Sequence, residues 1–79
     1  MDIAKEIHDY LIRELAEERD SFALDENLLS QGIVDSMGIL DLATFLETRF
    51  GITTTEDDLI PENFQSIATL CAFVESKKG

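Results

Sequence analysis

The side chain with the clearest chemical potential in this sequence is the hydroxyl of Ser36. It stands between Asp35 and Met37, where a loop leads into a predicted helix. A serine acts as a nucleophile when a base and an orienting acid lie beside it. The one histidine, His8, is distant in the sequence, and the Gly-x-Ser-x-Gly pattern of hydrolases is absent. A self-contained hydrolase is therefore disfavoured, and helix capping by Asp35 is the simplest interpretation of the pair.

Other reactive side chains give weaker indications. Cys71 is the only cysteine, which excludes a disulfide within the chain and a multi-thiolate metal site. It falls on the apolar side of the last predicted helix, and we expect it in the core. The run Glu56-Asp57-Asp58 lacks the spacing of a calcium-binding loop and is typical of a helix start. We predict no metal site.

The elements before Ser36 are a helix and a long loop. The helix is predicted over about residues 2–17, with Asp2 as its N-cap. Its apolar residues recur every four positions, namely Ile3, Ile7, Leu11 and Leu15. Residues 18–35 show no clean period, so a structured loop with one helical turn near residues 25–30 is expected. Its scattered apolar residues predict a strap across the core; they are Phe22, Leu24, Leu28, Leu29, Ile33 and Val34.

Ser36 begins the second main helix, which Asp35 should cap and Gly51 should end. The buried side of this helix is predicted by residues at helical spacing: Ile39, Leu42, Ala43, Leu46 and Phe50. Phe45 lies at the border of this stripe, and we expect it to pack against the last helix.

Two further elements are predicted toward the C-terminus. A short helix should follow Thr53–Thr55 and end near Pro61. Ser66 should cap a last helix with Lys77 and Lys78 in its final turn, where cations favour the helix dipole. Its apolar stripe consists of Ile67, Leu70, Cys71 and Val74. The sequence thus predicts a small all-α bundle of three main helices and one short helix, in a single domain over residues 1–79.

The charge balance limits the classes of partner. Seventeen acidic residues against six Lys and Arg give a net charge of −11. Nucleic acids and anionic membranes are bound by basic side chains, so both are disfavoured. The charged N-terminal residues predict no signal peptide, and no apolar stretch is long enough to predict a membrane span. We expect a cytoplasmic monomer whose partners present basic patches.

The order of these motifs resembles that of acyl carrier and peptidyl carrier proteins. The resemblance rests on Asp35-Ser36-Met37, entered from Gly32 and followed by Ile39-Leu40-Asp41-Leu42 and Phe50-Gly51. It extends over almost the whole chain, because Asp25–Leu29 and Asn63–Ile67 also fall at the family's usual places. Two residues separate Gly32 from Asp35, as in stand-alone D-alanyl, peptidyl and polyketide carriers. Fatty-acid carriers usually have one residue there.

The resemblance implies a function. Ser36 would carry 4′-phosphopantetheine, which a separate phosphopantetheinyl transferase takes from coenzyme A. Asp35 would position Ser36 and the transferase metal. The arm would hold an acyl or aminoacyl group as a thioester and present it to a loading enzyme and then to a downstream synthase or transferase. The cargo stays open at this point, with fatty acyl, polyketide, aminoacyl and D-alanyl groups as alternatives.

The outer side of the second helix is a candidate docking face. It presents a partly apolar strip flanked by acids, formed by Met37, Leu40, Asp41, Thr44 and Glu47. Acids of this kind attract basic partners, and the apolar residues make the short-range contacts. The same strip supports an alternative function. In that case the protein is an acidic helical module that docks a partner through this helix without a prosthetic group.

Overall fold

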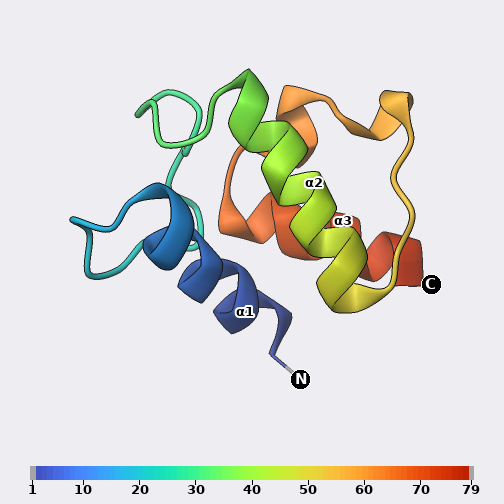
Figure 1. Ribbon diagram of the computed structural model, residues 1–79, viewed down its shortest axis with the longest axis horizontal. Helices are drawn as coiled ribbons and strands as arrows, with labels where there is room; N and C mark the ends of the chain where they lie inside the picture. The colour runs from blue at the N-terminus through green and yellow to red at the C-terminus, as the bar shows by residue number, and fades with distance from the viewer. Residues whose placement is uncertain (1, 79) are drawn as a thin grey trace.

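The computed structural model describes residues 2–78, and within them it is all-helical and contains no strand (Figure 1). The prediction of a small all-α fold is confirmed. The main helices are α1 (Ile3–Tyr10), α2 (Ser36–Phe50) and α3 (Ile67–Lys78). The shorter elements are a π-helical segment, Leu11–Leu15, and two 3₁₀ helices, Glu56–Asp58 (η2) and Pro61–Asn63 (η3).

The first helix begins as predicted and ends slightly early. Asp2 caps α1, and its carboxylate accepts a hydrogen bond from Lys5 N–H at 3.1 Å. The helix widens into the π-helical segment, where Ala16 N–H donates to the carbonyl of Leu11 at 2.9 Å. Helical structure therefore stops at Leu15, two residues before the predicted end. The wider turn carries Ala16 into the core, where its side chain is almost fully buried.

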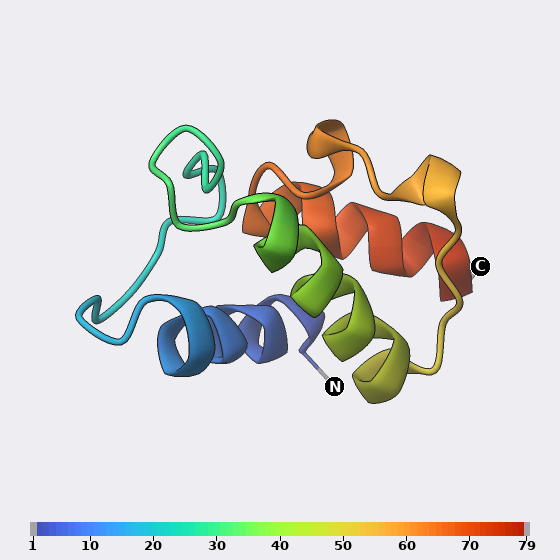
Figure 2. The ribbon, with the colours of Figure 1, turned by 45° about the horizontal axis from the view of Figure 1, so that its top comes forward.

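The strap loop, defined as residues 16–34, crosses from α1 to α2 as expected (Figure 2). Phe22, Leu28 and Val34 are buried, but Leu24 is 56% exposed and does not belong to the core. The prediction of a helical turn near residues 25–30 is wrong, because this part of the loop forms hydrogen-bonded turns and no helix. The side chain of Asn27 directs these turns by accepting hydrogen bonds from the next residues' amides.

One polar contact fastens the strap loop to α1, and several others hold the loop to itself. Nε2 of His8 accepts a hydrogen bond from Phe22 N–H at 3.1 Å. Nη2 of Arg19 donates to the Glu26 carboxylate at 2.9 Å and to the carbonyl of Ser21 at 3.0 Å. The Arg19 guanidinium also lies 4.3 Å from the centre of the Phe22 ring. His8 thus orders the loop that leads to Ser36.

The predicted short helix is in fact two separate turns. Thr55 caps η2, and its backbone N–H donates to the Asp58 carboxylate at 2.9 Å. Pro61 begins η3 rather than only ending the preceding turn, because proline fits the first position of a helix. Ser66 caps the last helix as predicted, and its hydroxyl accepts a hydrogen bond from Thr69 N–H at 3.2 Å.

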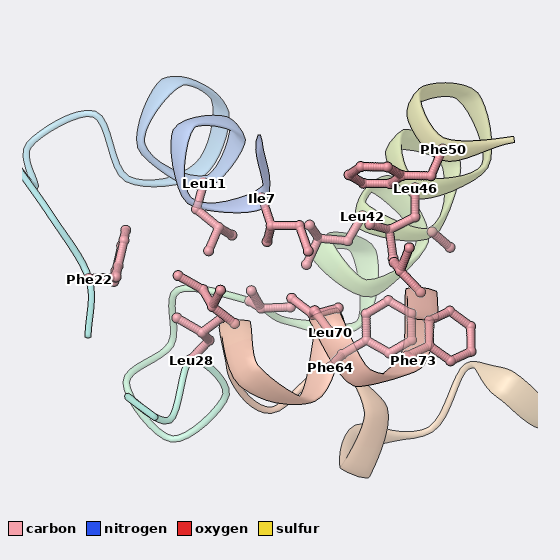
Figure 3. Packing of buried hydrophobic residues seen from close by; sticks show 14 of the residues in the cluster. Ile7, Leu11, Phe22, Leu28, Leu42, Leu46, Phe50, Phe64, Leu70 and Phe73 are labelled. Atoms are coloured by element: carbon pink, nitrogen blue, oxygen red, sulfur yellow. The ribbon is translucent and has the colours of Figure 1, made fainter. Parts of the chain in front are cut away.

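The core lies between α1, α2, α3 and the strap loop (Figure 3). Its ten largest fully buried side chains come from all of these elements and from Phe64. The prediction for Phe45 is wrong: its ring stacks on Tyr10 of α1, with 4.2 Å between ring centres, and not on α3. Aromatic stacking of this kind stabilises the contact between α1 and α2. The Glu6–Arg49 ion pair, with 2.7 Å between nitrogen and oxygen, joins the same two helices.

We predict that Leu28→Ala lowers the free energy of unfolding by about 2–5 kcal/mol, because it removes a fully buried side chain and leaves a cavity. Leu24→Ala is the matched control in the same loop. Its side chain is largely exposed, so the change should stay within about 0.5 kcal/mol. Urea unfolding followed by circular dichroism measures both values. Equal losses in the two variants would contradict the placement of the strap loop.

Candidate functional site

Ser36 is the first residue of α2 and is exposed. Asp35 caps the helix as predicted, with its Oδ1 atom accepting a hydrogen bond from Gly38 N–H at 2.8 Å. A helix start also has backbone N–H groups without partners in the helix and a partial positive charge. The serine hydroxyl is therefore presented at a position that suits a covalently attached phosphate.

Gly38 allows the first turn of α2 to pack closely on the chain that precedes it. A Cβ atom at Gly38 would lie 3.2 Å from Val34 Cγ1 and 3.4 Å from Asp35 Oδ1. The first of these contacts is tighter than nine in ten real Cβ contacts, so a larger residue would push against the buried side chain of Val34, whereas its contact with the capping carboxylate would be an ordinary one. The Gly38 position thus keeps the cap and the buried Val34 in place behind Ser36.

The strap loop fixes where Ser36 lies relative to α3. The carbonyl of Leu28 accepts hydrogen bonds from Ile33 N–H at 3.0 Å and Val34 N–H at 3.2 Å. Leu28 N–H donates to the carbonyl of Gln65 at 2.7 Å. The residues directly before Asp35 are therefore tied, through Leu28, to the segment that enters α3.

Four of the five residues predicted for docking are exposed on α2. Met37 is 69% exposed and Leu40 is 54% exposed, and Asp41 and Thr44 are also exposed. The spacing of these residues places them on one face, which runs from Ser36 along the helix. We call Met37, Leu40, Asp41 and Thr44 the docking ridge.

Glu47, the fifth predicted docking residue, is placed differently. Its side chain is only partly exposed, and its carboxylate accepts hydrogen bonds from Thr54 N–H at 2.8 Å and Thr54 Oγ1–H at 2.9 Å. The backbone hydrogen bond and the hydroxyl hydrogen bond from Thr54 lower the pKa of the Glu47 carboxyl below its ordinary value. The carboxylate therefore holds the segment after α2 in place, which leaves it less available to a partner than Asp41.

One exposed apolar residue near this face was missed by the sequence reasoning. Ile60 is 40% exposed and directly precedes η3. The η3 turn lies near the start of α2 in both views (Figures 1 and 2). An isoleucine outside any apolar stripe and next to Pro61 is the signal in the sequence that could have indicated it.

The stretch of sequence around Ser36 carries charge of one sign. Residues 20–48 contain six acidic residues and no Lys or Arg. Most of the chain's cations lie in ion pairs outside that range: Lys5–Asp9, Arg13–Glu14, Arg49–Glu6 and Lys77–Asp58, with Arg19 paired to Glu26 at its edge. The surface near Ser36 thus favours basic partners.

In the part of the chain that the structure describes, Cys71 and the potential metal-binding side chains show no sign of a reactive site. Cys71 is half-buried on α3, and burial raises the pKa of its thiol, so the reactive thiolate is scarce at neutral pH. Within residues 2–78, no three or more His, Cys, Asp and Glu side chains are grouped to hold a metal ion. The same residues include no helix with the length and apolar character needed to cross a membrane.

Comparisons with known proteins identify the family of the chain. The family model for the phosphopantetheine attachment site matches residues 5–74. The D-alanyl carrier protein of Streptococcus suis (strain 98HAH33) is 39% identical over 56 residues, which cover 71% of this chain and 71% of that protein. The D-alanyl carrier protein of Streptococcus sanguinis (strain SK36) is 44% identical over 52 residues, which cover 66% of this chain and 65% of that protein.

These matches confirm the predicted carrier family and the likeness to D-alanyl carriers, and they do not favour a docking module without a prosthetic group. Members of the family bind 4′-phosphopantetheine covalently. The chain therefore belongs to the phosphopantetheine attachment site family, and it is a carrier protein that bears a 4′-phosphopantetheine arm.

Proposed function

We propose that Ser36 is the attachment residue and that the cargo is an aminoacyl group, with D-alanyl as the specific candidate. The observation that carries the first part is the exposed Ser36 hydroxyl at the start of α2, beside a capping aspartate. The cargo is inferred from the relatives, which are named D-alanyl carrier proteins. The absence of Lys and Arg from residues 20–48 supports a cargo with a cationic amino group over one with a free carboxylate.

The attachment chemistry requires a second protein. Within a phosphopantetheinyl transferase, Ser36 Oγ would form a bond to the β-phosphorus of coenzyme A, and the bond to the adenosine 3′,5′-bisphosphate leaving group would break. The serine proton would pass to a base on the transferase, since His8 is engaged with the strap loop. When bound, the arm supplies a thiol that holds the cargo as a thioester. The N–H groups at the start of α2 would then face the phosphodiester.

Asp35 has two tasks in this proposal. Its Oδ1 atom caps α2 through Gly38, which holds Ser36 in the first turn. Its carboxylate charge would help to position the metal ion that the transferase uses. A phosphate on Ser36 would be repelled by this charge, so the bond to Gly38 N–H also serves to keep the carboxylate directed at the backbone.

We further propose that the docking ridge and Ile60 meet the transferase, the loading enzyme and a downstream transferase. Met37, Leu40 and Ile60 offer apolar contacts, and Asp41 attracts basic side chains. Exposed charges are screened by salt, so these complexes should weaken as ionic strength rises. We also propose that the protein is a monomer and that it acts in the cytoplasm, where coenzyme A is available.

The attachment site is tested by mass. Incubation with a broad-specificity phosphopantetheinyl transferase, magnesium and coenzyme A should add one phosphopantetheinyl group to the wild-type chain. Ser36→Ala should add none, because the attacking oxygen is lost. Ser30→Ala removes another exposed serine from the loop and should react like the wild type. An adduct on Ser36→Ala, or none on the wild type, would contradict the proposal.

The two tasks of Asp35 can be separated by two substitutions. Asp35→Asn keeps an oxygen for Gly38 N–H, so its stability should stay near that of the wild type. Asp35→Ala removes the cap and should cost about 1 kcal/mol. Both should slow modification by about tenfold or more if the charge positions the metal. Initial rates and thermal unfolding measure the two effects, with Asp20→Asn, an exposed aspartate outside the docking ridge, as control. A normal rate for Asp35→Asn would refute the metal-positioning task.

The docking ridge is tested with two leucines of nearly equal exposure. Leu40→Ala should raise the KM of the transferase for the carrier by about fivefold or more, because an apolar contact in the interface is lost. Leu24→Ala should leave KM unchanged, since Leu24 lies in the strap loop outside the ridge. Steady-state kinetics at two salt concentrations give both values. Equal KM changes in the two variants would count against docking through α2.

A further inference from the structure

A hollow of about 410 Å³ lies between the strap loop and the segment that leads into α3. One wall comes from the turns around Leu28, and the other comes from η3 and the residues after it. The lining residues are Asn27, Leu29, Ser30, Pro61, Glu62 and Gln65. The hydrogen bond from Leu28 N–H to the carbonyl of Gln65 holds the two walls together.

The lining is mainly neutral and combines apolar and amide character. Leu29 and Pro61 supply aliphatic surface, and Ser30 and Gln65 supply a hydroxyl and an amide. The Oδ1 atom of Asn27 accepts hydrogen bonds from the amides of Leu29 and Ser30, so the NH₂ group is its remaining part for a ligand. A ligand with amide groups and a branched aliphatic part would find matching chemistry here.

The hollow lies near Ser36, and the backbone hydrogen bond between Leu28 and Val34 sets a limit on the distance between them. The carbonyl of Leu28 lies 3.2 Å from the nitrogen of Val34, which is two residues before Ser36. Standard backbone dimensions then place the amide of Leu29 within about 15 Å of the Cα atom of Ser36. Figures 1 and 2 show the loop and the η3 segment on the same end of the molecule as the start of α2.

We propose that this hollow binds the neutral part of the phosphopantetheine arm, an inference that rests on attachment at Ser36 as proposed above. The arm has two amide groups and a geminal dimethyl group, which suit the amide and aliphatic parts of the lining. Glu62 is the one formally charged residue of the lining and disfavours an anion, so the phosphodiester stays at the start of α2. Because the arm is tethered, weak contacts suffice to hold it.

Two other hollows suit the arm less well. One, of about 630 Å³, has charged side chains in its wall from Asp58, Glu62 and Lys77. The other, of about 510 Å³, is lined by Asp2 and Glu75 among others. It lies between the start of α1 and residues 71–75 of α3, away from the start of α2 (Figure 1).

Amide NMR spectra of the ¹⁵N-labelled apo and holo chains test this subsite. Intact mass first establishes that the arm is on Ser36, so a failed attachment is recognised separately. In the holo chain we expect shift changes at Leu29, Ser30 and Gln65 in addition to those next to Ser36. We also expect nuclear Overhauser contacts between the geminal methyl protons of the arm and the Leu29 side chain. Changes confined to residues 35–39 of a fully modified chain would overturn the proposal.

The chain contains two glutamines, which provide a matched pair of variants. Gln65→Ala keeps the backbone carbonyl that Leu28 uses and removes only the side-chain amide. It should reduce the arm-induced shift changes at Leu29 and Ser30 to half or less. Gln31→Ala, whose side chain contacts Arg19 rather than the hollow, should leave them unchanged. Unchanged perturbations in holo Gln65→Ala, or equal losses in both variants, would overturn the assignment.

Discussion

The hydrogen bond from Leu28 N–H to the carbonyl of Gln65, at 2.7 Å, joins the strap loop to the segment that enters α3. Buried backbone groups must be paired, and a loop has no regular ladder that does this. Here the Leu28 carbonyl accepts hydrogen bonds from two amides, its N–H donates a hydrogen bond to one carbonyl, and its side chain lies fully buried in the core. The position of Ser36 relative to α3 depends on this arrangement, as does the hollow between the two segments.

The two sides of α2 divide the requirements of a carrier between them. The inner side buries Leu42, Ala43 and Leu46 and fixes the helix, so that Ser36, the proposed attachment residue, has a rigid support. The outer side leaves Met37 and Leu40 exposed, at a small cost in solvation, and under the proposal above these residues make contacts that form and break repeatedly. A stable permanent interface would need a larger apolar area than this single helix face provides.

The parts of the structure that depend on neighbouring residues could be predicted from the sequence. The bounds of α2 follow from Asp35 and Gly51, because a capping carboxylate and a left-handed glycine act within one helical turn. The stacking of Phe45 on Tyr10 and the contact of Glu47 with Thr54 could not be predicted. Both depend on how distant segments are brought together, and periodicity shows only that a residue lies near the edge of a buried stripe.

The absence of Lys and Arg from residues 20–48 also has a consequence for a population of identical carriers. When two copies approach each other with the surfaces around Ser36 facing, the negative charges on both surfaces repel, and this repulsion opposes a lasting encounter. The same field therefore opposes self-association through the face that carries Ser36 and leaves that face open to basic partners.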